Sequence, residues 1–107
     1  MATPILTTLL VPSQAFASWL ETDLQGRIEV MEDDGLGDSP DCQDAYAVAH
    51  ALREVKAFPA TIELSDAEAQ QAAISVENLR DYGEEAEIPQ DDLEAALGHL
   101  REQGLPR

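Results

Sequence analysis

Charge is the feature that most limits how this chain can fold. The chain carries 22 Asp and Glu residues against six Lys and Arg, which gives a net charge of −16 over 107 residues. Self-repulsion of this size opposes compaction and is expected to cost stability at low ionic strength. Hydrophobic residues nevertheless make up 44% of the chain, which favours a folded core over disorder. The length allows one domain, which we assign to residues 1–107.

The charge is distributed unevenly along the chain. Residues 1–20 contain no charged side chain. Residues 21–44, the first acidic block, hold nine acidic residues against one arginine, a net charge of −8. Residues 63–94, the second acidic block, hold eleven acidic residues against one arginine, a net charge of −10. The remaining stretches are close to neutral, so the two blocks are the candidate functional feature.

Three short segments have the pattern of β-strands. Residues 5–11 are β-compatible and almost continuously apolar, which is typical of a strand covered on both faces. In residues 27–31, Arg27, Glu29 and Met31 alternate with Ile28 and Val30, and residues 60–64 alternate in the same way. The pattern therefore predicts three strands.

Two helices are expected in the first half of the chain. Ser13 is a suitable N-cap for the first, and Gly26 suits a left-handed residue that ends it. The second begins at the Ser39-Pro40 dipeptide, with proline at the first helical position, and ends at the Phe58-Pro59 dipeptide.

Two further helices are expected in the second half. Ser65 and Glu68 have the spacing of a capping box, in which each side chain accepts a hydrogen bond from the other residue's amide. That helix ends at Tyr82-Gly83, and the last helix runs from Pro89 to Gly104. The order strand, helix, strand, helix, strand, helix, helix predicts a small α/β or α+β domain of about three strands and four helices.

No motif in the chain indicates a reaction, a metal or a cofactor. The acidic residues of segment 32–38 lack the spacing of a helix-loop-helix calcium site. Gly35-Leu36-Gly37 is surrounded by carboxylates, which repel phosphate. His50, His99 and Cys42 show no paired metal-ligand spacing and no nucleophile partner. We therefore expect a protein that is not an enzyme and uses no cofactor.

The compartment expected from the sequence is the cytoplasm of a bacterial cell or of a phage-infected host. Cys42 is the single cysteine and cannot form an internal disulfide. The apolar start lacks the positively charged leader of a secretory signal, and no segment is long enough to span a bilayer.

The acidic blocks predict a binding face that imitates nucleic acid. Carboxylates four residues apart on a helix are separated by about 6 Å of rise, and B-DNA phosphates repeat every ~3.4 Å of axis per strand. The residues expected to bind a partner from the first acidic block are Glu32, Asp33, Asp34, Asp38 and Asp41. Those expected from the second are Asp66, Glu77, Asp81, Glu84, Glu85, Glu87, Asp91, Asp92 and Glu94.

In size and charge the chain resembles two groups of small acidic proteins. One group is the phage-encoded anti-restriction and anti-CRISPR inhibitors, some of which mimic DNA, and the other is the cytoplasmic inhibitors of basic ribonucleases. No motif matches either group residue by residue. The resemblance implies an inhibitor that binds a basic, nucleic-acid-binding protein and touches neither nucleic acid nor a membrane itself.

Other interpretations stay open at this point. Acidic residues in the first turn of a helix stabilise it through the helix dipole and need no partner, and a salt-adapted organism also favours acidic side chains. The alternative function is a non-catalytic structural or assembly subunit that forms homo-oligomers through an apolar patch around Trp19 and Phe16. An enzyme is the third interpretation and would need a deep pocket that pairs His50 or His99 with a carboxylate.

Overall fold

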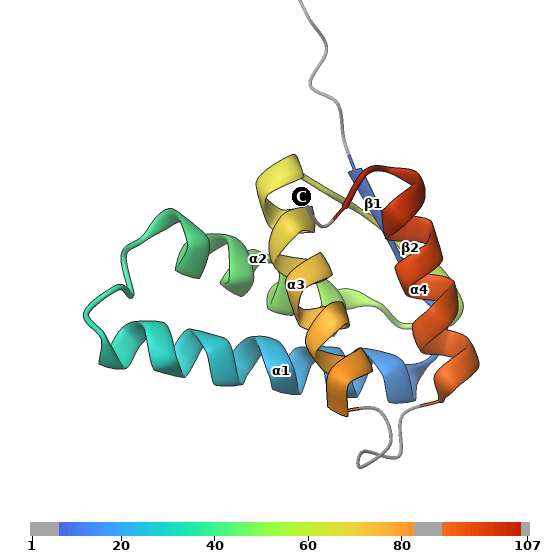
Figure 1. Ribbon diagram of the computed structural model, residues 1–107, viewed down its shortest axis with the longest axis horizontal. Coiled ribbons are helices and arrows are strands. Elements are labelled where there is room, and N and C mark those ends of the chain that lie inside the picture. The colour runs from blue at the N-terminus through green and yellow to red at the C-terminus, as the bar shows by residue number, and fades with distance from the viewer. Residues whose placement is uncertain (1–6, 83–88, 106–107) are drawn as a thin grey trace, which may run out of the picture.

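The structure is a computed structural model that describes residues 7–82 and 89–105. Within these ranges the chain forms four helices and a two-stranded antiparallel sheet, so the domain is α+β (Figure 1). In chain order the elements are β1 (Thr7–Val11), α1 (Gln14–Asp33), α2 (Pro40–Glu54), β2 (Ala60–Leu64), α3 (Asp66–Tyr82) and α4 (Gln90–Glu102).

Two of the three predicted strands are present and pair with each other. Thr7 lies opposite Leu64, and Val11 lies opposite Ala60. The predicted strand at residues 5–11 is found as β1 from Thr7, and its first two residues lie outside the described part of the chain. Alternate side chains of β1 are buried, and those between them are half-buried.

The strand predicted at residues 27–31 is wrong, because α1 continues through this segment to Asp33. Leu20, Leu24 and Ile28 recur every four residues and are all buried on one side of the helix. Val30, which a strand would bury together with Ile28, is 61% exposed. Gly26 was predicted to end the helix but lies inside it, without the positive φ of a left-handed residue.

The predicted helix ends rest on hydrogen bonds that the structure shows. Ser13 and Ser39 each accept a hydrogen bond from the amide three residues ahead, at 3.2 and 3.3 Å. The capping box is complete, with distances of 2.8 Å from the Ser65 amide to Glu68 and 3.1 Å from the Glu68 amide to Ser65. Gly104 has φ +83° just after α4, as predicted for a helix stop. Helix α2 ends earlier than predicted, at Glu54.

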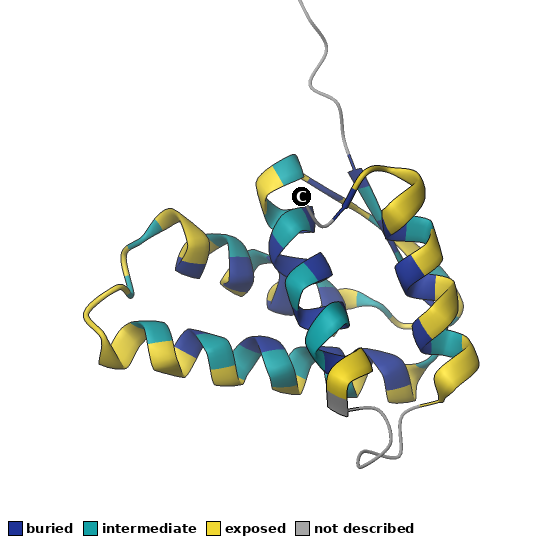
Figure 2. Cartoon of the chain, in the orientation of Figure 1, coloured by how far each residue is buried: buried dark blue, intermediate teal, exposed yellow. Residues whose placement is uncertain are grey.

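The helices share one hydrophobic core, which lies on their facing sides (Figure 2). Helices α1 and α2 form an antiparallel hairpin, α3 packs across both, and α4 packs against β1 and α3 (Figure 1). The face that α3 buries includes Ala69, Ala72, Ala73 and Ser75, and these small side chains let its backbone approach the hairpin closely. The largest fully buried side chains include Phe16, Leu9, Leu20, Leu24, Ile28, Leu93 and Leu100.

None of the described helices combines the length with the apolar character that crossing a bilayer requires.

Candidate functional site

The connection between α1 and α2 gathers five of the predicted binding residues at one end of the molecule. We call this segment, residues 32–41, the hairpin end. It comprises the last turn of α1, a short loop and the first turn of α2, and it lies far from the sheet along the long axis (Figure 1). All five predicted residues are exposed there: Glu32, Asp33, Asp34, Asp38 and Asp41.

Backbone hydrogen bonds hold the loop of the hairpin end in a defined shape. The amide of Gly35 donates to the carbonyl of Glu32 at 3.0 Å, and the amide of Leu36 donates to the carbonyl of Met31 at 2.7 Å. Gly35 has φ +79°, a conformation that favours glycine and that reverses the chain after α1. The Gln43 side chain donates to the carbonyl of Gly37 at 3.0 Å. The carboxylates are therefore attached to an ordered frame.

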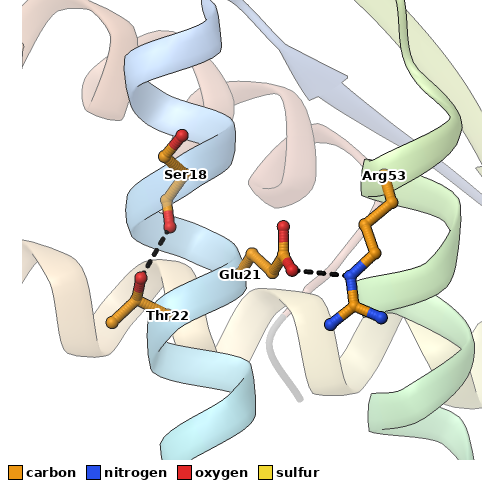
Figure 3. Close-up of polar contacts among 4 residues, drawn as sticks. All are labelled: Ser18, Glu21, Thr22 and Arg53. Carbon is orange, nitrogen blue, oxygen red and sulfur yellow. Dashed lines mark hydrogen bonds and ion pairs between the residues drawn. The ribbon is translucent and has the colours of Figure 1, made fainter.

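The carboxylates of the hairpin end have few partners inside the protein. Within the part of the chain that the structure describes, Asp33, Asp34 and Asp38 form no ion pair. Nearer the sheet, by contrast, Glu21 of α1 pairs with Arg53 of α2 at 2.6 Å (Figure 3). The negative charge at the hairpin end is therefore left for solvent or for another molecule.

Nearby titratable groups respond to this charge. The hydrogen bond to Glu32 is the main cause that raises the pKa of Tyr46, followed by burial. Burial raises the pKa of the Cys42 thiol, and the charges of Glu32 and Asp38 raise it further. Cys42 is fully buried, so at neutral pH it is a neutral packing residue and not a nucleophile.

One contact region connects the first acidic block with the second. Burial raises the pKa of Asp44, and the negative charges of Glu68 and Asp41 add to the effect. Glu68 lies in the first turn of α3, whereas the two aspartates lie on α2. The charge of Glu68 at the start of α3 is therefore close enough to Asp44 to influence its ionisation.

The predicted residues of the second acidic block lie in separate places. Asp66 and Asp81 lie near opposite ends of α3, which places them about 22 Å apart along the helix. Asp91, Asp92 and Glu94 lie in the first turns of α4. Figure 1 shows this end of α4 well away from the hairpin end. The described residues of the second block thus do not form one row with those of the first.

Glu77 and Asp92 of the second block each have a partner on another helix or at its start. Glu77 pairs with Arg80 at 2.9 Å and with Arg101 at 3.3 Å. Asp92 accepts a hydrogen bond of 2.6 Å from the Ser13 hydroxyl, which joins α4 to the start of α1. Glu84, Glu85 and Glu87, also predicted to bind a partner, lie outside the described residues.

A groove that the sequence analysis missed lies between α1 and the C-terminal half of α3. It has a volume of about 600 Å³, and much of its lining is apolar. The principal lining side chains are Trp19, Asp23, Arg27, Val30, Met31 and Leu79.

The sequence analysis had placed an apolar patch around Trp19 and Phe16. Trp19 does line the groove, but Phe16 is fully buried, so that part of the prediction is wrong. The signal that would have revealed the groove is helical spacing. Trp19, Gly26 and Val30 fall on one side of a helix, but only when α1 is continued past residue 26.

Arg27 lines the groove and binds α3. Its guanidinium donates to the Gln71 carbonyl at 3.0 Å, to the Ser75 hydroxyl at 2.8 Å, and also to the Gln71 side-chain oxygen. Burial lowers the pKa of Arg27, and the charges of Asp23 and Asp41 oppose this effect. The positive charge of Arg27 is therefore used to hold α1 against α3.

The two histidines do not belong to the groove. The Thr8 hydroxyl lies 2.7 Å from His99 Nε2, a contact that joins β1 to α4. His50 is exposed, and its Nε2 lies 3.8 Å from Glu54. Over residues 7–82 and 89–105, no three His, Cys, Asp or Glu side chains are grouped closely enough to hold a metal ion.

Comparisons with protein-family models, with curated proteins and with solved structures find no match to this chain. Its function is therefore inferred from the hairpin end and from the groove.

Proposed function

We propose that this chain is a non-catalytic, acidic interaction protein that binds a basic, nucleic-acid-binding protein and inhibits it. The observation that carries the proposal is the hairpin end. Five exposed acidic residues lie within residues 32–41, and Asp33, Asp34 and Asp38 form no ion pair with the described residues. In this proposal the hairpin end occupies the cationic groove in which the partner otherwise holds phosphates.

The physics of such an encounter favours this chain as a competitor. A net charge of −16 attracts a basic surface over long range and repels nucleic acid. Close pairs between the carboxylates and Arg or Lys of the partner then fix the register of the complex. Because the loop is already held by backbone hydrogen bonds, little conformational entropy is lost when it binds.

The binding face is proposed to be more local than the sequence suggested. It consists of the hairpin end, extended towards α3 by Asp44 and Glu68. A role of the phage type, such as an anti-restriction or anti-CRISPR inhibitor acting in the bacterial cytoplasm, is the finer form of this proposal. It is supported only by charge, size and this local cluster.

The test compares two variants that each lose three charges. One carries Asp33→Asn, Asp34→Asn and Asp38→Asn, and the matched variant removes three exposed acids of the second block: Asp81→Asn, Asp91→Asn and Glu94→Gln. Tagged wild-type protein is used to capture partners from a nuclease-treated lysate of its source cells. We expect a basic, nucleic-acid-binding protein whose affinity falls steeply with salt and which duplex DNA displaces.

The proposal predicts different binding for the two variants. The hairpin-end variant should lose the captured protein, and the matched variant should retain most of the binding. Equal binding at low and high ionic strength, or equal binding by the hairpin-end variant and wild type, contradicts the proposal.

The groove favours a second candidate function, a structural or assembly subunit. Val30 is 61% exposed beside Trp19, and such apolar surface is common where chains associate. Analytical ultracentrifugation over a range of concentrations separates the two candidates. A stable homo-oligomer that survives neutralisation of the hairpin end supports assembly, and a monomer supports the acidic inhibitor.

A further inference from the structure

We infer that the groove between α1 and α3 receives a basic, amphipathic helix of the partner protein. The inference rests on the proposed function to the extent that the partner is basic. It adds a second contact region, with its own chemistry, beside the hairpin end.

Gly26 is the first observation that points to an occupant. A glycine in the interior of a helix costs about 1 kcal/mol relative to alanine. Gly26 lies in the middle of α1 without a positive φ, and a Cβ added there would meet nothing within 4 Å. Neither backbone geometry nor packing inside the chain accounts for this glycine. Its effect is to let another backbone come close to α1.

The residues that share one side of α1 with Gly26 are also small. Ser18 and Thr22 precede it at intervals of four residues, so the three small residues lie on one side of α1. The Thr22 hydroxyl donates to the Ser18 carbonyl at 2.9 Å and is turned back onto its own helix (Figure 3). Glu21 is directed towards Arg53 of α2 in the same view. The Thr22 hydroxyl and the Glu21 side chain are therefore both turned away from a helix that would approach Gly26.

The apolar side of the groove fits the apolar stripe of a helix. Trp19 and Met31 are partly buried against the core and keep some apolar surface, whereas Leu79 of α3, on the opposite side of the groove, is buried. Val30 is 61% exposed, the most exposed of the large hydrophobic side chains in the described chain. Covering these groups would remove apolar surface from water, which is favourable.

The charges around the groove select a basic occupant. Asp23 lines the groove and accepts a hydrogen bond from the Asn78 side chain at 3.2 Å, so the acids that face outwards are Glu29, exposed on the neighbouring side of α1, and Asp33. Asp33 lies seven residues after Gly26, almost on the same side of the helix, so the groove leads directly to the hairpin end. The cation in the groove, Arg27, is bound to Gln71 and Ser75.

The same charges argue against a second copy of this chain. A homodimer through the groove would bring two chains of net charge −16 together. A basic helix meets the apolar stripe and the acidic rim at once, and its cationic side chains can reach Asp33.

Trp19 makes a direct test available, because it is the only tryptophan in the chain and it lines the groove. The probe is a tryptophan-free peptide of about 18 residues, five helical turns, made of leucine and lysine in an amphipathic pattern. A peptide of the same composition with a scrambled order is the control for charge. We expect a saturable change in Trp19 emission with the amphipathic peptide, and binding at least about tenfold weaker with the scrambled peptide.

Two glycine substitutions make a matched pair. Gly26→Leu fills the groove, and Gly98→Leu places the same side chain at an exposed helix-interior glycine of α4, where a Cβ also meets nothing within 4 Å. Both should fold at least as well as wild type, because leucine favours helix over glycine. We expect Gly26→Leu to weaken peptide binding about tenfold or more and Gly98→Leu to leave it unchanged.

Three results would overturn the inference. They are absence of peptide binding, equal binding by Gly26→Leu and wild type, and a dimer in ultracentrifugation that Gly26→Leu abolishes. If the hairpin-end variant still loses the captured partner in any of these cases, the proposed function stands while the inference fails. If the captured partner is not basic, the proposed function fails, and binding of the amphipathic peptide that Gly26→Leu abolishes still supports the groove.

Discussion

The hairpin end and the opposite end of the molecule use polar side chains in different ways. Around β1 and α4, polar groups bind one another: Thr8 contacts His99, and Gln103 accepts from the Thr8 amide at 2.8 Å. At the same end Ser13 donates to Asp92. At the hairpin end the loop is held by its own backbone, and Asp33, Asp34 and Asp38 form no ion pair with the described residues.

This difference separates charges that serve the fold from charges that serve something else. An acidic side chain that receives a hydrogen bond from a distant element helps to fix the position of that element. Exposed acidic side chains that lack a hydrogen-bond or ion-pair partner repel one another, and this repulsion reduces stability. Local features that the fold does not need are commonly functional. The contrast therefore identifies the hairpin end, and not the acidic residues in general, as the candidate binding surface.

The largest expected effect comes from breaking the link between α1 and α3 at Arg27, which lies between the two ends of α1. Arg27→Met keeps much of the aliphatic stem but removes the hydrogen bonds to Gln71 and Ser75, which are themselves buried. We expect a loss of about 1.5–3 kcal/mol in the free energy of unfolding, measured by urea denaturation. Arg27→Lys can retain one of these hydrogen bonds and should therefore lose less unfolding free energy than Arg27→Met. An unchanged urea midpoint in the Met variant would show that α3 does not depend on this contact.

A smaller change in the free energy of unfolding is expected when charges are removed from each of the two ends in turn. Glu77→Gln weakens the pairs with Arg80 and Arg101 and should cost about 0.5–1 kcal/mol. Asp34→Asn combined with Asp38→Asn removes two charges from the hairpin end, and should leave stability within about 0.5 kcal/mol of wild type or raise it at low salt. Urea denaturation at low and moderate salt measures both. If the double variant at the hairpin end is less stable than Glu77→Gln, the proposed difference between the two ends is contradicted.

The smallest effect concerns the pH dependence of Asp44. Its pKa is raised in the folded chain by burial and by the charges of Glu68 and Asp41, so the ionised carboxylate destabilises the fold at neutral pH. This penalty shrinks as the pH falls through the raised pKa and is gone below the ordinary Asp value of about 3.9. Asp44→Asn should therefore raise the melting temperature at pH 7 and lose this advantage in acid.

Thermal unfolding followed by circular dichroism at several pH values measures the effect of Asp44→Asn. Asp38→Asn serves as the control on the exposed loop and should change stability less. An advantage of Asp44→Asn that persists unchanged at acid pH would mean that the side-chain charge is not its cause.

Local signals explain the parts of the fold and of the site that were predicted correctly. The caps at Ser13 and Ser39, the capping box at Ser65 and the stop at Gly104 each depend on a few neighbouring residues. The acids of the hairpin end came together for the same reason. They are close in sequence, and any turn between two helices keeps them close in space.

The strand predicted at residues 27–31 failed because two periods overlap in a short segment. Alternation around Ile28 and Val30 suggests a strand, but Ile28 also continues the four-residue spacing of Leu20 and Leu24. The groove was missed with it, since Val30 joins Trp19 only on a continuous helix.

The sequence by itself determined the helix starts at Ser13, Ser39 and Ser65, the stop at Gly104, two strand positions and the presence of an acidic turn after Met31, because these depend on neighbours in the chain. Tertiary structure alone decided which acids are paired, since Ser13 meets Asp92 across 79 positions and Glu77 meets Arg101 across 24. It also decided the length of α1 and hence the groove, because only packing against α2 and α3 defines which side of that helix is buried.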